Sequence, residues 1–165
     1  MGSEDTVREQ VEKEQAAEDV KERLEREHSE LLEELRVLIP GAEVLFGFLL
    51  AIRFTREFDD LNSVQEYVYY VTLLSTAVAL VLLLAPAVHH RIRFREGDKE
   101  YLLRKANREA IAGSAAIAFA FSGVLFVVTD LVFGTVAAAA VTVTFVAFTA
   151  WRWWALALYR SLTDR

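Results

Sequence analysis

Four long apolar segments dominate the hydrophobic pattern of this chain. They are Leu35–Phe54, Tyr67–Val88, Ala110–Phe133 and Thr135–Trp154, the last two with approximate ends. A helix needs about 20 apolar residues to cross a hydrocarbon core, and these segments do not alternate as membrane strands do. Because backbone groups in lipid must pair within their own helix or barrel, the pattern predicts an all-α, polytopic membrane protein with four transmembrane helices.

The segment before the first apolar run is its opposite in composition. Residues 1–36 contain 13 acidic and 6 basic residues. They are rich in Glu, Ala, Lys, Arg and Leu, which favours one charged helix. The apolar positions Val20, Leu24, Leu31 and Leu35 are too irregular for a convincing coiled-coil seam. A solvated helix and a weakly oligomerising coil both remain open. We therefore divide the chain into a charged helix, residues 1–36, and a transmembrane domain, residues 37–165.

The distribution of Lys and Arg predicts the orientation in the membrane. Six precede the first span and seven lie in the loop 89–109, whereas the connection between the first two spans holds Arg53 and Arg56. Basic loops stay in the cytoplasm. Both termini of this multi-pass chain are therefore expected on the cytoplasmic side of the cell membrane.

Aromatic and arginine clusters mark the expected levels of the lipid headgroups. Tyr67, Tyr69 and Tyr70 suit the outer interface, because tyrosine and tryptophan gather at headgroup level. The Arg-rich start of the loop suits anionic lipids. The expected headgroup contacts are Arg91, Arg93, Arg95, Trp151, Arg152, Trp153 and Trp154. Within the loop, Gly97 is expected to end one helix and Asp98 to cap the next.

Several kinds of chemistry are not expected. The chain has no cysteine, and His28, His89 and His90 all fall outside the predicted spans. It contains no Ser/His/acid arrangement, metal-ligand cluster or glycine-rich phosphate loop. We expect no enzyme activity, metal or cofactor. Nucleic acid is a poor partner because the acidic helix lies on the same side as the basic loop.

Glu43 is the most unusual residue of the first apolar segment. It follows Pro40 by three residues, so one interpretation breaks the helix near Ile39 and makes Glu43 a first-turn acid of a new helix. A second interpretation rests on depth. Glu43 lies about 10 Å inside Arg36, where an ionised acid costs at least about 2.5 kcal/mol and should face the bundle or a water-filled path. A third is a structural pair with Arg36.

Other residues are candidates for ion handling or for helix contact. Asp130, near the outer end of the third span, is either an interfacial cap or part of a cation relay with Glu43. Arg36 and Arg53 bracket the first span. Small residues spaced three or four apart mark close helix contact, and the candidates are Gly47, Ala116, Ala120 and Gly123. The third span has a second small face, with Ser114, Ala118 and Ser122, which suggests contact with another subunit and a homo-oligomer.

The runs "ELLEELRVLIPGAEVLFGFLLAIRF" and "LLLAPAVHHRIRFREGDKEYLLRKANREAIAG" resemble a family of small four-span bacterial membrane proteins without an assigned function. The shared pattern is Leu-Arg-Val, Pro-Gly, Val-Leu-Phe, Ala-Pro-x-x-His-Arg and Ala-Asn, over roughly residues 30–154. Members sometimes carry the automatic label sodium:proton antiporter, so the resemblance implies ion transport but no residue roles. Where such proteins tend to have proline before the phenylalanine that ends the first span, this chain has Arg53.

Two functions from different classes follow. In the first, a homo-oligomer transports protons or small cations, with Glu43 as the titrating group. In the second, the spans anchor a non-transporting interaction or scaffold module that binds a partner through the acidic helix. Transport predicts a hydrated path to Glu43, and an anchor predicts a dry, close-packed bundle.

Overall fold

The computed structural model describes residues 2–92 and 99–155, and every regular element in those residues is helical. The elements are α1 (Gly2–Ile52), a 3₁₀ turn (Arg56–Asp60), α2 (Ser63–Ile92), α3 (Lys99–Phe133), α4 (Thr135–Ala150) and a π-helical turn (Trp151–Ala155). Four of these helices are long and apolar enough to cross a membrane. The all-α, four-span prediction is confirmed at that level. The expected turn around Gly97 lies outside the described residues.

Helix α1 runs without interruption through Pro40, so the predicted break near Ile39 is wrong. Proline removes the hydrogen bond to the Arg36 carbonyl but leaves its neighbours free to continue the ladder. Packing on both sides of the proline holds the two halves in line, because Leu35 and Ala42 are both buried in one cluster with Leu83 of α2. The acidic segment and the first span are therefore one rod about 77 Å long.

The chain reverses direction twice at one end of the bundle, which we call the turn end. Before α2, the Asn62 side chain accepts the N–H groups of Val64 and Gln65, both at 3.0 Å. Gln65 Oε1 accepts the Asn62 N–H at 2.9 Å in return, which completes a capping box. Between α3 and α4, Gly134 has φ of 82°, a conformation that favours glycine.

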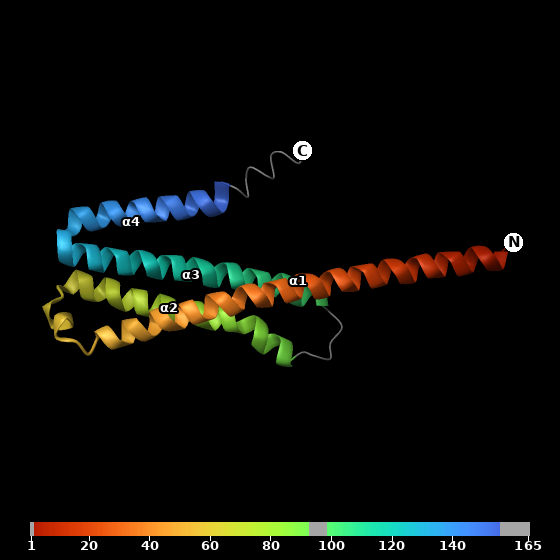
Figure 1. Ribbon diagram of the computed structural model, residues 1–165, viewed down its shortest axis with the longest axis horizontal. Coiled ribbons are helices and arrows are strands. Elements are labelled where there is room, and N and C mark those ends of the chain that lie inside the picture. Colours follow the sequence, from red (N-terminus) through yellow and green to blue (C-terminus); the bar gives the residue numbers. More distant parts are fainter. Residues whose placement is uncertain (1, 93–98, 156–165) are drawn as a thin grey trace.

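Helices α2 and α3 form the central antiparallel hairpin (Figure 1). Helix α1 packs against both, and α4 packs against α3 on the side away from α1. The acidic half of α1 extends past the other end of the hairpin, which we call the loop end because the 93–98 connection lies there. Since α3 has neighbours on two sides, its two small-residue faces do not by themselves require a second subunit.

Small side chains allow α2 and α3 to approach closely. A Cβ at Gly123 would collide with Thr72 Oγ1, and a Cβ at Gly113 would lie 2.8 Å from the Leu83 side chain. Ala79 and Ala120 are fully buried. Contacts of this kind replace hydrophobic burial as the force between helices in lipid. The hairpin is therefore the tightly packed centre of the molecule.

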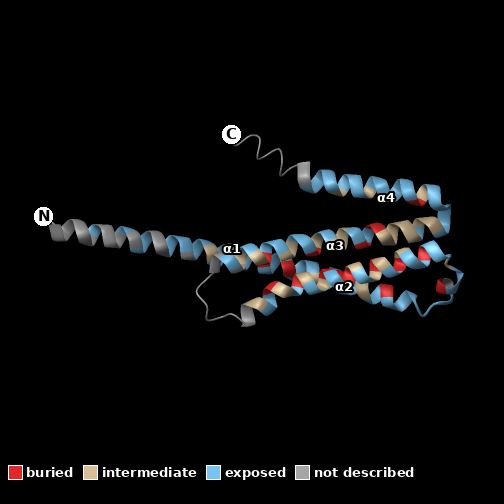
Figure 2. Ribbon diagram, turned by 180° about the vertical axis from the view of Figure 1, so that it is seen from behind, coloured by how far each residue is buried: buried red, intermediate tan, exposed pale blue. Residues whose placement is uncertain are grey.

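The outer surface is apolar over most of its length, and Figure 2 shows α4 almost entirely exposed. In α4 only Ala138 is buried, whereas large side chains such as Val136, Val143 and Phe148 are exposed. An apolar surface of this extent is typical of a protein that contacts lipid or another protein.

Candidate functional site

A polar layer joins α2 to α3 at the turn end. The Gln65 amide donates to Asp130 Oδ2 at 2.7 Å, and Gln65 is buried. The same glutamine belongs to the capping box of α2, so the carboxylate of Asp130 is held next to the amino terminus of that helix. A negative charge is stabilised there by the helix dipole. Asp130 is thus a link between helices.

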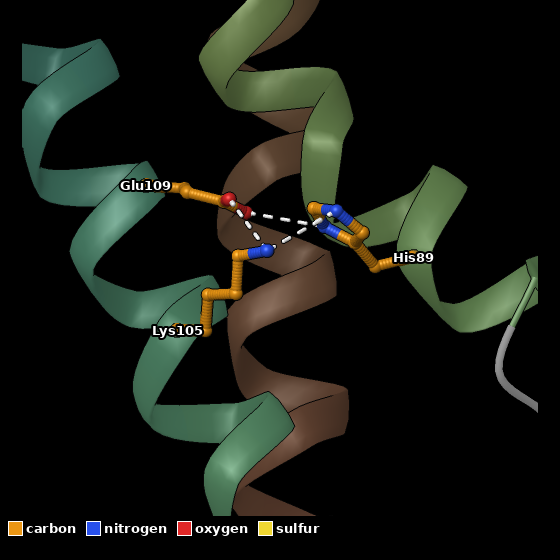
Figure 3. A network of polar contacts seen from close by, with 3 residues as sticks. All are labelled: His89, Lys105 and Glu109. Carbon is orange, nitrogen blue, oxygen red and sulfur yellow. Dashed lines mark hydrogen bonds and ion pairs between the residues drawn. The ribbon is translucent and has the colours of Figure 1, made fainter. Parts of the chain in front are cut away.

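A second polar layer joins the same helices at the loop end (Figure 3). His89 Nδ1 of α2 lies 3.5 Å from Glu109 Oε2 of α3, and Lys105 Nζ lies 3.9 Å from Glu109 Oε1. Lys105 Nζ also lies 3.4 Å from His89 Nε2. Glu109 Oε2 is buried and has no hydrogen-bond partner among the described residues. The two ring nitrogens of His89 therefore face different neighbours, Nδ1 the Glu109 carboxylate and Nε2 the Lys105 ammonium group.

The spacing of these two layers matches the thickness of a membrane. Glu109 and Asp130 are 21 residues apart on α3, which corresponds to about 32 Å along a helix. The hydrocarbon core of a bilayer is about 30 Å thick. Between the layers three hydroxyls of α2 bond to backbone carbonyls: Ser75 to Ala116 at 3.0 Å, and Thr72 and Thr76 to their own helix. The Thr142 hydroxyl of α4 is buried without a partner in the ranges that the structure describes. Polar groups in lipid need such internal partners.

Glu43 lies between the layers, on the outside of the bundle. The Tyr69 hydroxyl donates to the Leu49 carbonyl at 2.7 Å, which ties α1 to α2 about one turn inside the Gln65 layer. Glu43 lies six residues before Leu49, about 9 Å nearer the loop end along α1. Glu43 is thus in the middle third of the distance between the two polar layers. Its side chain is exposed. The expectation that Glu43 faces the bundle is wrong for a single chain, because Ala42 and Leu49 occupy the inward face.

The structure does not bring the four ion-handling candidates together. Arg36 is exposed, and no ion pair joins it to Glu43 within the described part of the chain. Asp130 belongs to the turn-end layer. The Arg53 guanidinium stacks over the Phe58 ring at 4.5 Å, and its Nη1 lies 3.9 Å from Asp59 Oδ1. Arg53 therefore lies just after the end of α1, where its side chain covers the edge-to-face pair of Phe58 and Tyr69.

The helix-contact candidates divide into two groups. Ala120 is fully buried, the Ala116 carbonyl accepts the Ser75 hydroxyl, and Gly123 lies against Thr72, so all three lie in the α2–α3 interface. Gly47 is different, because a Cβ there would have no neighbouring atom within 4 Å. No other helix in the described parts of the same chain packs against Gly47, so the predicted helix contact there stays a prediction.

The expected headgroup residues are described only in part. Trp151, Arg152 and Trp153 are exposed in the turn that follows α4. Helix α4 runs toward the loop end but stops short of the ends of α2 and α3 there (Figure 1). The Trp151 ring lies 6.2 Å from that of Phe148. Arg93 and Arg95 lie outside the described residues, as do the side chains of Arg91 and Trp154.

An open groove of about 320 Å³ lies beyond the loop-end layer, between α1 and α3. Glu27, Glu30 and Glu34 of α1 form its acidic side. Leu31, Leu103, Arg104 and Asn107 complete the lining. Leu31 is buried with Leu35 and Ala106 in the cluster below, so this part of α1 is held against α3. The lining of the groove thus combines acidic, basic and apolar side chains.

Sequence reasoning missed Gln65 and Glu109, which complete the two polar layers. Asn62 followed three residues later by Gln65 is a capping-box signature, so the position of Gln65 could have been found. Glu109 was hidden among the charges before the third span. No group of His, Asp and Glu in the described ranges is arranged to hold a metal ion.

A family model matches residues 17–157, and its description is a family of unknown function, DUF6328. No curated protein and no solved structure matches the chain.

Proposed function

The chain belongs to this family of unknown function, and we propose that it is a multi-pass protein of the cell membrane with both termini in the cytoplasm. The two polar layers support this proposal, because their separation fits a hydrocarbon core. Arg104, Lys105 and Arg108 lie at the loop end, whereas the described basic residues at the turn end are Arg53 and Arg56. The positive-inside rule then makes the loop end cytoplasmic.

The role that the geometry supports best is a membrane-anchored interaction module. One observation carries it: α1 is a single helix that begins far outside the bundle and ends within it. Because Leu31 and Leu35 pack where the helix leaves the bundle, the acidic half is held at a defined angle to the membrane. A rigid helix of this kind presents its charged surface to a partner in the cytoplasm.

The partner that fits best is a basic, amphipathic segment of a cytosolic protein. Three carboxylates and Arg104 line the groove between α1 and α3, and Leu31 and Leu103 supply apolar contact. Glu27 is paired with Arg23 of its own helix at 2.8 Å, so Glu30 and Glu34 are the main acidic contacts for a partner. Complementary charge accelerates association and selects partners, and grooves with an apolar floor accept amphipathic helices.

Native membranes carrying the tagged full-length protein provide the test. The groove variant Glu27→Gln/Glu30→Gln/Glu34→Gln is compared with Glu12→Gln/Glu14→Gln/Glu18→Gln, which removes the same charge farther along α1. We expect a partner with a basic segment to co-purify with the native protein and the control variant, and to be lost from the groove variant. Equal recovery from both variants would contradict the proposed role of the groove.

A second candidate is conduction of protons or small cations by a homo-oligomer, and the position of Glu43 favours it. A carboxyl group at mid-membrane depth can exchange a proton if water reaches it. Because Glu43 lies outside the bundle of one chain, any such path would run between subunits. Proton flux into liposomes tests this: flux by the native protein that vanishes with Glu43→Gln supports conduction, and equal flux with the two proteins contradicts it.

Contact with anionic lipid headgroups is proposed for the loop end. Exposed Trp151, Arg152 and Trp153 suit the cytoplasmic interface, where aromatic rings and basic side chains meet lipid. Arg91, Arg93 and Arg95 stay proposed headgroup contacts on the grounds of sequence alone.

A further inference from the structure

One face of α1 is exposed and repeats with a spacing of four and three residues. We call it the Glu43 face: Arg36, Pro40, Glu43, Gly47 and Leu50, all exposed. Such spacing keeps positions aligned with a neighbouring helix over several turns. The inward face of the same helix, with Leu35, Ala42 and Leu49, is already occupied by α2 and α3.

A carboxyl group on this face cannot remain unpartnered in lipid without cost. An ionised acid at mid-membrane costs at least about 2.5 kcal/mol. The hydroxyls of Ser75, Thr72 and Thr76, at a similar depth, already donate to backbone carbonyls. Arg36 lies seven residues away, about 10 Å nearer the loop end, where its long side chain can reach the headgroups. Glu43 therefore needs a donor or acceptor from outside its own chain.

We propose that a second copy of this chain covers the Glu43 face, and that the two Glu43 carboxyl groups share one proton across the dimer axis. This inference rests on the proposed insertion into a membrane. All copies insert with the same orientation, so a two-fold axis along the membrane normal brings each Glu43 to the depth of the other. One neutral carboxyl donates to the carboxylate of its partner, and the proton comes from water during assembly.

The space around Gly47 makes this approach possible. Gly47 lies one turn beyond Glu43 on the same face, and no atom of its own chain lies within 4 Å of the position that a Cβ would occupy. Glycine at a helix contact lets two backbones come close together. A second copy supplies a carboxyl group at the same depth as Glu43 and a glycine on the same face, so each glycine leaves room for the other chain. The face is therefore self-complementary, which favours a second copy over an unrelated helix.

Cysteine cross-linking in native membranes tests the dimer, since the chain has no cysteine of its own. Leu50→Cys places a thiol on the Glu43 face. Phe48→Cys is the matched control: it is also exposed, lies two residues away, and points about 160° away around the helix. We expect a mild oxidant to produce disulfide-linked dimers of Leu50→Cys and few of Phe48→Cys.

A second pair of variants tests the shared proton. In the Leu50→Cys background, Glu43→Gln keeps a group that can hydrogen-bond to its copy, whereas Glu43→Leu does not. We expect cross-linking to persist with Gln and the dimerisation constant to fall about three- to thirtyfold with Leu, the range that an interhelical hydrogen bond in a membrane supports. If Glu43→Leu leaves the cross-linking unchanged, the proposed hydrogen bond between the two Glu43 carboxyl groups is wrong.

The outcomes separate this inference from the proposed function. If the protein resists carbonate extraction from the membrane but Leu50→Cys cross-links no better than Phe48→Cys, the dimer is wrong and membrane insertion stands. Cross-linking of Leu50→Cys to another protein would also overturn the second copy as occupant. A protein that carbonate releases from the membrane would overturn both.

Discussion

Two glycines of similar sequence context have opposite surroundings. Gly123 lies against Thr72 in the α2–α3 interface, whereas Gly47 faces open space on α1. We predict that Gly123→Ala lowers the free energy of unfolding by about 1–3 kcal/mol, because the added methyl group forces the helices apart. Gly47→Ala should leave it unchanged or raise it by up to about 1 kcal/mol through helix propensity.

The measurement is reversible unfolding in mixed micelles, followed by circular dichroism at protein concentrations where the chain is monomeric. A similar loss of stability with both substitutions would contradict the contrast between the two sites.

Asp130 and Gln65 form a link whose removal is also measurable. Gln65→Leu takes away the donor to Asp130 and the acceptor in the capping box. We predict a loss of about 1–3 kcal/mol, because a partly buried carboxylate is left without its hydrogen bond. Asp60→Asn, an exposed acid at the same end of the molecule, serves as the control and should change stability by less than about 0.5 kcal/mol. The same unfolding assay applies, and equal effects would rule the link out as a source of stability.

Residue-level prediction is most effective where local chemistry is decisive. The place of Asp130 about one turn from the end of α3 follows directly from the sequence, and the role of Asn62 could be deduced from capping rules. The interfacial position of Asp130 stays a prediction. The exposure of Glu43 could not be deduced, because lipid and protein interior are both apolar. A transmembrane helix therefore lacks the polar outer face that marks the inward side in water.

The continuity of α1 is the main result at the level of elements. Pro40 suggested a helix boundary, yet tertiary packing at Leu35 and Ala42 overrides that local signal. We predict that Pro40→Ala raises the free energy of unfolding by up to about 3 kcal/mol, since it restores the bond to the Arg36 carbonyl. Gly41→Ala, with open space around it, is the control and should gain about 1 kcal/mol or less.

A decrease in stability with Pro40→Ala would indicate that proline begins a helix in the native protein, as the local sequence suggests. The unfolding assay in micelles distinguishes the two outcomes, and amide exchange at residues 36–40 would locate the restored hydrogen bond.

The helices themselves were predictable from hydropathy, because length and composition alone decide whether a segment can span. Their arrangement was not. The neighbours of α3 depend on where Gly113 and Gly123 meet Leu83 and Thr72, and such pairs involve residues far apart in the sequence. The spans also extend past their apolar cores: α2 begins at Ser63 and α3 at Lys99, because helices continue into water when capping and packing allow.

At the scale of the whole molecule, the account places two polar layers at the surfaces of a membrane and the acidic rod of α1 in the cytoplasm. The layers, the basic loop end and the apolar outer surface all depend on that arrangement. The role of the groove, the Glu43 dimer and any ion path depend on it as well.

Accessibility of single cysteines in intact cells tests this arrangement most directly. Asp60→Cys lies at the turn end and Ser29→Cys on the acidic part of α1, and both positions are exposed. A membrane-impermeant maleimide should label Asp60→Cys in intact cells, and Ser29→Cys only after the membrane is opened. Labelling of both cysteines from the same side would contradict the four-span arrangement on which the account rests.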